Sequence, residues 1–125
     1  MSYLVFVLIL LLPLPIHAQT TEASVSSQAH AKYDAGDLDQ AKTLFTEFLE
    51  RFPSSSLAPD AQYFLGWIAH KKNTGDAEKV WQTVVDKYPQ SPEAPKALMS
   101  IGAVHYKAKM DRVVRTANRS RTCGM

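Results

Sequence analysis

Residues 33–53 read YDAGDLDQAKTLFTEFLERFP, and the second half of this stretch occurs twice in the chain. AKTLFTEFLERFP, residues 41–53, is matched 36 residues later by AEKVWQTVVDKYP, residues 77–89. The segments that follow the two copies also match at this interval, as Ser55, Pro59 and Gly66 do with Ser91, Pro95 and Gly102. A fixed period of this length is typical of proteins that stack helical units, each burying its apolar face against its neighbours. The sequence therefore predicts a stack whose exposed surface carries the function.

The spacing of apolar residues indicates helices throughout the repeated region. In residues 38–52 apolar side chains recur at intervals of three and four, as on one face of a helix. Asp37 and Gln40 form an expected capping pair before this helix, Ser55 is expected to cap the next, and Pro59 suits a first helical turn. The expected helices cover about residues 24–35, 38–52, 55–73, 77–88 and 91–109. Five aromatic residues on their stripes are assigned to the core: Phe45, Phe48, Phe64, Trp81 and Tyr88.

The repeat fails after Met110. Val113, Ala117 and Ser120 stand where the preceding unit has Ala77, Trp81 and Val84, so the large aromatic is lost. We interpret residues 111–125 as an incomplete last helix and basic tail. A truncation or a frame shift would give the same pattern.

The first 18 residues differ from the rest of the chain. A run of ten apolar residues from Tyr3 to Leu12 is too short to cross a bilayer, which takes about 20 residues in a helix. Pro13 and Pro15 follow, and then the small residue Ala18. This pattern predicts a secretory signal peptide, residues 1–18, cleaved near Ala18–Gln19. The mature domain, residues 19–110, is then expected in an exported compartment, without a membrane span.

Charge and motifs argue against several functional classes. Through Met110 the chain has 10 basic and 11 acidic residues, so the expected domain carries no nucleic-acid footprint. His30, His70 and His105 stand at different repeat positions, without a second histidine four residues away, which does not favour a metal site. No catalytic triad or phosphate-binding glycine loop is present in the sequence. We therefore expect a protein that is not an enzyme and has no cofactor.

The repeat resembles the tetratricopeptide repeat, whose pattern has Leu-Gly in the first helix, then Ala-x-x-x-Phe and a closing proline in the second. Leu65-Gly66 with Ala77, Trp81 and Pro89 fits this pattern. The resemblance implies an all-α fold, a right-handed stack of antiparallel helical hairpins with about two and a half repeats of 36 residues.

One branch of that family is especially similar. After Phe-Pro or Tyr-Pro, the connections FPSSSLAPDAQ and YPQSPEAPKAL resemble the C-terminal domain of the Tol–Pal system proteins YbgF, also called cell division coordinators CpoB. This resemblance implies a periplasmic adaptor that binds an envelope protein of the Tol type during division. The alternatives are an outer-membrane assembly role like that of BamD, or another secreted scaffold of this repeat type. An enzyme or a ligand-binding protein is a further alternative.

The resemblance also implies where a partner would bind. In tetratricopeptide arrays, positions on the first helix of each hairpin generally face the concave groove. The residues at such positions, off the core stripes, are Tyr63, Trp67, His70, Lys71, Lys96, Met99, Tyr106 and Lys107. The alternative is that these side chains only cover the hairpins as amphipathic surface.

Overall fold

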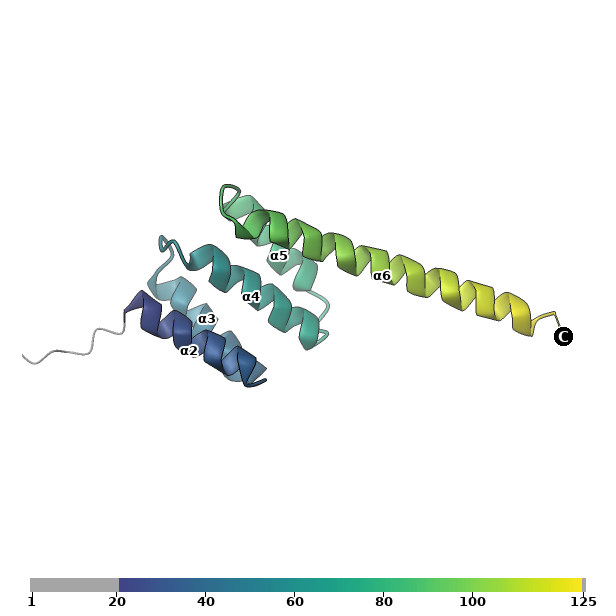
Figure 1. The fold of residues 1–125 in the computed structure, drawn as a ribbon, viewed down its shortest axis with the longest axis horizontal. Coiled ribbons are helices and arrows are strands. Elements are labelled where there is room, and N and C mark those ends of the chain that lie inside the picture. The colour runs from purple at the N-terminus through teal and green to yellow at the C-terminus, as the bar shows by residue number, and fades with distance from the viewer. Residues whose placement is uncertain (1–20, 125) are drawn as a thin grey trace, which may run out of the picture.

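Five helices make up most of the computed structural model, which describes residues 21–124 (Figure 1). The helices are Glu22–Asp34 (α2), Leu38–Arg51 (α3), Ala58–Lys71 (α4), Ala77–Lys87 (α5) and Glu93–Thr122 (α6). α2 packs on α3 and α4 packs on α5, so that two hairpins stack and α6 follows as the first helix of a third. The all-α stack of about two and a half hairpins confirms the expected fold class. The predicted signal peptide, residues 1–18, lies outside the described residues.

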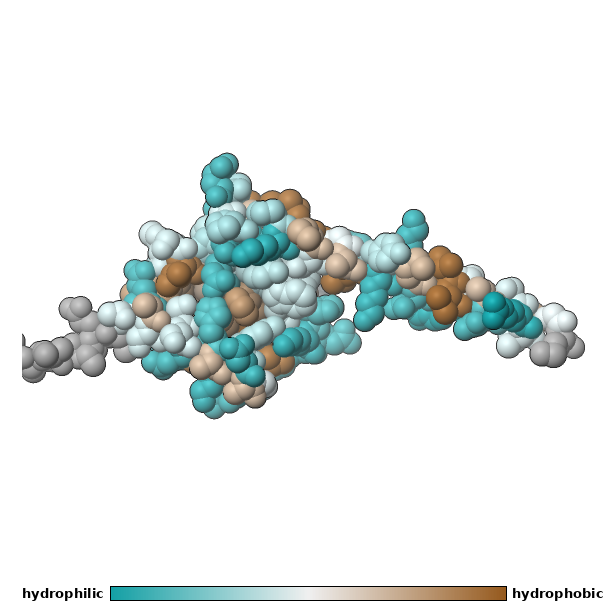
Figure 2. Space-filling view, in the orientation of Figure 1, coloured by the Kyte–Doolittle hydropathy of each residue, from teal (hydrophilic) through white to brown (hydrophobic). Residues whose placement is uncertain are grey.

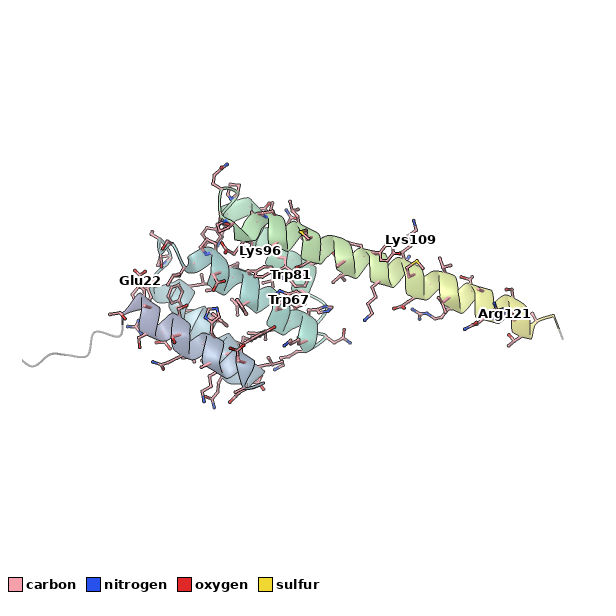
Figure 3. All side chains as sticks on the ribbon, in the orientation of Figure 1. Glu22, Trp67, Trp81, Lys96, Lys109 and Arg121 are labelled. Atoms are coloured by element: carbon pink, nitrogen blue, oxygen red, sulfur yellow. The ribbon has the colours of Figure 1, made fainter. Side chains whose placement is uncertain are left out.

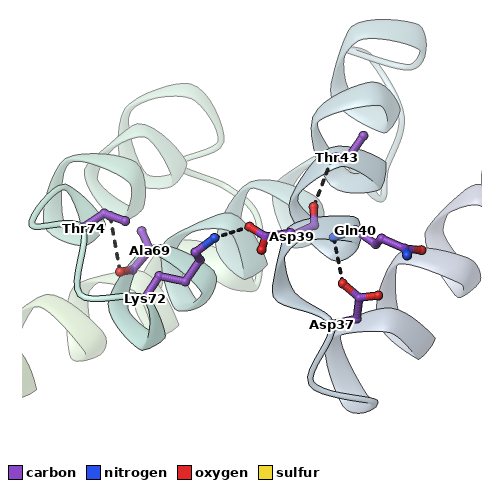
Figure 4. Close-up of polar contacts among 7 residues, drawn as sticks. All are labelled: Asp37, Asp39, Gln40, Thr43, Ala69, Lys72 and Thr74. Atoms are coloured by element: carbon purple, nitrogen blue, oxygen red, sulfur yellow. Dashed lines mark hydrogen bonds and ion pairs between the residues drawn. The ribbon is translucent and has the colours of Figure 1, made fainter.

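The ends of the helices follow local chemistry. The Asp37 side chain accepts a hydrogen bond from the backbone N–H of Gln40 at 3.2 Å, as the capping pair predicts (Figure 4). Pro59 lies in the first turn of α4, where its missing N–H costs least. Ser55 does not cap α4: its Oγ accepts from the N–H of Leu57 at 3.1 Å, in the turn before the helix. The expectation for Ser55 was therefore wrong by one turn, because residues 56–57 form a turn before α4 begins.

Two residues with positive φ reverse the chain between α4 and α5. Asn73 has φ 53° and Gly75 has φ 83°, a region that favours glycine and tolerates asparagine. Lys109 and Asp111 stand at these positions 36 residues later. With no glycine there, the chain does not turn, and α6 continues to Thr122. The expected end of the fifth helix near Lys109 was wrong for this reason, and residues 111–122 extend α6.

The core consists of two clusters joined through α4. Phe45 and Phe48 of α3 are fully buried in the first cluster, which also includes Ile68. Trp81 and Val84 of α5 are fully buried in the second. The expected core aromatics are thereby confirmed, with Phe64 and Tyr88 partly buried against the first cluster.

Gly66 allows α4 and α5 to approach closely. A Cβ atom added at Gly66 would lie 2.2 Å from Nε1 of Trp81, so only glycine fits beneath the indole ring. The same Nε1 donates a hydrogen bond to the backbone carbonyl of Tyr63 at 3.2 Å. The glycine of the Leu-Gly part of the repeat pattern and the tryptophan of its Ala-x-x-x-Trp part are thus packed against each other.

α6 packs on the bundle only through its first half. Ala94, Ala97 and Ser100 are buried against the bundle, whereas every residue from 105 to 124 is exposed. Residues 105–122, called the arm below, project beyond the other helices (Figures 1 and 2). Figure 2 shows an apolar patch on this arm amid hydrophilic surface. Val113 and Val114, which are part of the arm, are each 53% exposed.

Candidate partner-binding groove

An open groove runs between α4 and the middle of α6, with the aromatic residues of α4 and α5 at its base. Trp67 and Trp81 lie on this side of the bundle, facing α6 (Figure 3). The groove is lined by Trp67, His70, Trp81, Ser100, Ala103, Val104, Lys107, Ala108 and Asp111. It is therefore apolar at its base and carries charge at the end nearer the arm.

The floor of the groove is a set of rings in contact with one another. The ring centroids of Trp67 and Trp81 are 5.3 Å apart, at an interplanar angle of 76°. The His70 ring lies 5.7 Å from Trp67 and 5.9 Å from Trp81. Edge-to-face contacts of this kind stabilise aromatic pairs beyond the area that they bury. These contacts restrict the rotamers of the rings, and a side chain that is already ordered costs less entropy when a ligand binds.

A hydrogen-bonded pair closes one end of the groove. The hydroxyl oxygens of Tyr63 and Ser100 are 3.4 Å apart, joining α4 to α6. Ser100 gives its only hydroxyl proton to the backbone carbonyl of Lys96 at 3.0 Å, so Tyr63 is the donor between the two. Ser100 stands 36 residues after Phe64. A small side chain at a position that is aromatic in the preceding unit leaves room for the groove.

The lining of the groove includes one lysine and one acidic residue. His70 and Lys107 stand on opposite walls, and Asp111 is the one acidic residue in the lining. The side chains of His70 and Lys107 are exposed. The apolar floor suits a segment that places an apolar or aromatic side chain on Trp67, and Lys107 offers one contact for a carboxylate, with Asp111 in the same lining.

The eight residues expected to bind a partner do not all meet in this groove. Trp67, His70 and Lys107 line it, and Tyr63 lies at its closed end. Lys71 lies on the other side of α4, with Nζ 4.3 Å from the centroid of the Tyr33 ring.

The remaining three expected residues are all on α6. Lys96 forms an ion pair with Glu93 at 3.6 Å in the first turn of that helix. Met99 and Tyr106 are 75% and 68% exposed and are not part of the lining. Ser100 and Val104 were missed from the sequence, although their spacing of four residues is the signal that could have revealed them.

A second hollow lies on the other side of α4, between α3 and α5. Its lining includes Lys42, Gln62, Lys72 and Thr74. Most of these polar groups already have partners: Gln62 donates to the carbonyl of Val80 at 3.4 Å, and Lys72 pairs with Asp39 (Figure 4). Lys72 holds the pKa of the exposed Asp39 carboxyl below its ordinary value, first by hydrogen bonding and then by its charge. The polar residues of this hollow therefore hold neighbouring helices of the two hairpins together.

His30, His70 and His105, the histidines within the described residues, have separate surroundings. His30 packs against Phe45 and Phe64 and lies 2.9 Å from Asp60, whereas Nε2 of His105 lies 3.0 Å from Glu78. Within residues 21–124, no group of three or more His, Cys, Asp and Glu side chains is placed to hold a metal ion. In the same part of the chain, no helix combines the length and apolar character that crossing a bilayer requires.

Comparison with known protein families finds a match for the first part of the stack. Residues 27–78, from within α2 to the start of α5, match the family model of the tetratricopeptide repeat. None of the curated proteins compared with the chain matches it. Repeats of this family generally mediate protein–protein interaction, and they typically act as non-enzymatic scaffolds. The family match detects a tetratricopeptide repeat in residues 27–78, and the paired hairpins and the Gly66–Trp81 contact agree with this kind of fold.

Proposed function

We propose that this protein is a non-enzymatic adaptor of the bacterial periplasm, of the Tol–Pal and cell-division type. It binds a segment of an envelope protein in the groove between α4 and α6. The groove whose accessible rings are Trp67 and His70, packed on the buried Trp81, supports this proposal most directly, because helical-repeat proteins bind their partners on such surfaces. The resemblance of the 36-residue repeat to YbgF and CpoB supports the choice of partner. The predicted signal peptide supports the compartment.

The groove defines the chemistry of the segment it would take. Trp67 is half-buried and offers one ring face to a ligand, while Lys107 extends from the opposite wall. A bound segment with an apolar anchor and a carboxylate would contact both. Anchors of this kind account for most of the binding energy in an interface, and the charged rim mainly sets the association rate.

Binding of a Tol-type periplasmic domain, measured by titration calorimetry, tests the proposal. Trp67→Ala should weaken binding by about 2 kcal/mol or more, as expected for an aromatic anchor. Lys107→Ala should mainly slow association and reduce its dependence on salt. Because Trp67 also touches Trp81, the melting temperature of each variant is measured in parallel.

A double variant on the outer helix α3 provides the control. Lys42→Ala with Glu50→Ala changes two exposed side chains outside the groove and should bind like the wild type. Normal binding by Trp67→Ala, together with loss of binding by the α3 variant, would move the partner to the opposite surface. If every variant and the wild type fail to bind, the Tol-type partner is wrong.

A further inference from the structure

The side of α6 that faces away from α5 carries a row of exposed apolar residues, which Lys109 interrupts. Six of the exposed large apolar residues in the described chain lie on this one helix: Leu98, Met99, Tyr106, Met110, Val113 and Val114. At 100° per residue, five of these six, all but Val114, share one side with Gly102 and Ala117, opposite the buried Ala97 and Val104 side. We call this surface, formed by Leu98, Met99, Gly102, Tyr106, Met110, Val113 and Ala117, the free face.

In the preceding hairpin, the positions equivalent to the first part of the free face are covered by a second helix. Gln62 donates to the carbonyl of Val80, and Gly66 lies directly under Trp81. The residues 36 positions later are Leu98 and Gly102. Leu98 is 53% exposed, and a Cβ atom added at Gly102 would meet nothing within 4 Å. α6 thus retains a site on which a second helix could pack, at Leu98 and Gly102, and no helix of this chain covers that site within the described residues. We call these two positions the seat.

The segment in register with the second helix is present but is carried away from this seat. Ala117 stands 36 residues after Trp81, as Gly102 does after Gly66. Because α6 has no turn at residues 109–111, Ala117 lies about 22 Å along the helix from Gly102, at about 1.5 Å per residue. Only a different molecule can place that segment on Gly102 while α6 stays straight.

We propose that a second copy of this chain supplies the covering segment, by antiparallel pairing of two α6 helices. The register of this pairing follows from the α4–α5 hairpin, in which Gly66 lies under Trp81. The midpoint between Gly102 and Ala117 is the Lys109–Met110 bond, which lies 36 residues after the midpoint between Gly66 and Trp81. A two-fold axis at this bond sets Gly102 against the second copy's Ala117, and Tyr106 against its Val113.

This arrangement is self-complementary. The seat and the segment that would fill it lie on the same side of one straight helix. A single two-fold axis therefore places the segment of each copy on the seat of the other. The small pair Gly102 and Ala117 lets the helices approach, and Tyr106 with Val113 supplies the larger contact. Pairing of two copies covers the apolar residues of the seat and those of the arm at once. A partner bound only at the seat, or only at the arm, would leave the other group exposed.

The positive charge of α6 opposes the pairing, and it makes dimerisation depend on salt concentration. Residues 103–122 contain six basic residues and one acidic residue, Asp111. Lys109 falls between Leu98 and Gly102 around the helix and beside the two-fold axis, so it lies close to Lys109 of the second copy. Added salt screens this repulsion beyond a Debye length of about 10 Å at 0.1 M. The dimer should therefore strengthen as salt is raised. An acidic helix from another protein would bind more weakly under the same change.

Cysteine pairs test the register. The protein with Cys123→Ser, Gly102→Cys and Ala117→Cys is oxidised, and its mass is measured by light scattering and non-reducing gel electrophoresis. We expect a covalent dimer, because the two positions face each other only between copies and a disulfide needs Cα atoms within about 7 Å. The matched control, Val104→Cys with Arg115→Cys, has the same midpoint on the opposite side of α6 and should stay unlinked.

Grafting the turn of the preceding hairpin supplies the second test. Lys109→Asn, Met110→Thr and Asp111→Gly reproduce Asn73-Thr74-Gly75, so α6 can fold back on itself. In sedimentation experiments, we expect the wild type to form a dimer that is favoured by concentration and salt, and the graft to be a monomer. With the cysteine pair added, the graft should form its disulfide within one chain. A wild type that stays monomeric at every concentration, or that forms the intrachain disulfide itself, would overturn the proposal.

Discussion

At the scale of single residues, Trp81 connects three features of the fold. Its ring lies over Gly66, its Nε1 donates to the carbonyl of Tyr63, and its face forms part of the groove floor with Trp67 and His70. The side chain is fully buried, whereas Trp67 is only half-buried. Two tryptophans 14 residues apart therefore have different roles, one mainly in stability and one available for binding.

This difference predicts unequal effects of truncation. Trp81→Ala should cost about 3–5 kcal/mol of the free energy of unfolding, because it leaves a cavity and removes a hydrogen bond. Trp67→Ala should cost clearly less. Thermal melts followed by circular dichroism compare the two variants. Equal losses would mean that the groove floor is as important to the fold as the core.

His30 and Asp60 form the other notable residue-scale contact. Nδ1 of His30 lies 2.7 Å from the carbonyl oxygen of Ser26, which can only accept, so Nδ1 is a donor. Nε2 lies 2.9 Å from Oδ2 of Asp60, and a hydrogen bond there requires a proton on one of these two atoms. Burial raises the pKa of Asp60 above its ordinary value near 3.8, and this outweighs the opposing charge of His30.

The raised pKa predicts that Asp60→Asn stabilises the protein at neutral pH. A carboxyl with a raised folded-state pKa contributes stability in acid and loses it as pH rises through that pKa. Asparagine donates to Nε2 without burying a charge. The melting temperature of the variant should exceed that of the wild type at neutral pH, and the difference should shrink on acidification. Asp86→Asn, which is exposed on α5, is the control, and a variant that melts lower at neutral pH would mean that the ion pair dominates.

At the scale of helices, the sequence predicted α3 and α5 well because each carries one apolar stripe that ends shortly before a proline, and Asp37 also caps α3. It did not predict the length of α6. The repeat led us to expect a turn near Lys109, but the turn depends on Asn73 and Gly75, whose counterparts lack their backbone freedom. The groove was partly predicted, through Trp67, His70 and Lys107. Ser100 and Val104 were missed, although their spacing of four residues places them on one side of α6.

Amide hydrogen exchange should divide α6 in two. In dilute protein, residues after Met110 should exchange fast, because all of those described are exposed, while α3 to α5 stay protected. In concentrated protein, residues 113–120 should become protected if two copies pair. Slow exchange of the arm in dilute protein would instead show that it packs on its own bundle.

At the scale of the whole molecule, contacts run almost entirely between neighbours. α4 is the one helix that packs on α3, α5 and α6 together, so it joins both core clusters and one wall of the groove. In such a stack, stability is close to a sum of unit and interface contributions. Changes in the arm should therefore leave the first hairpin undisturbed.

The straight α6 also determines how the protein moves through a solvent or a gel matrix. A helix of 30 residues is about 45 Å long, whereas a compact domain of about 100 residues has a radius of gyration near 13 Å. The frictional drag on this chain should accordingly exceed that of a sphere of equal mass. A single copy would elute early from a sizing column, at the volume of a heavier globular protein. Elution volume by itself would thus make one copy resemble two, whereas scattered-light intensity, which depends on mass, would distinguish them.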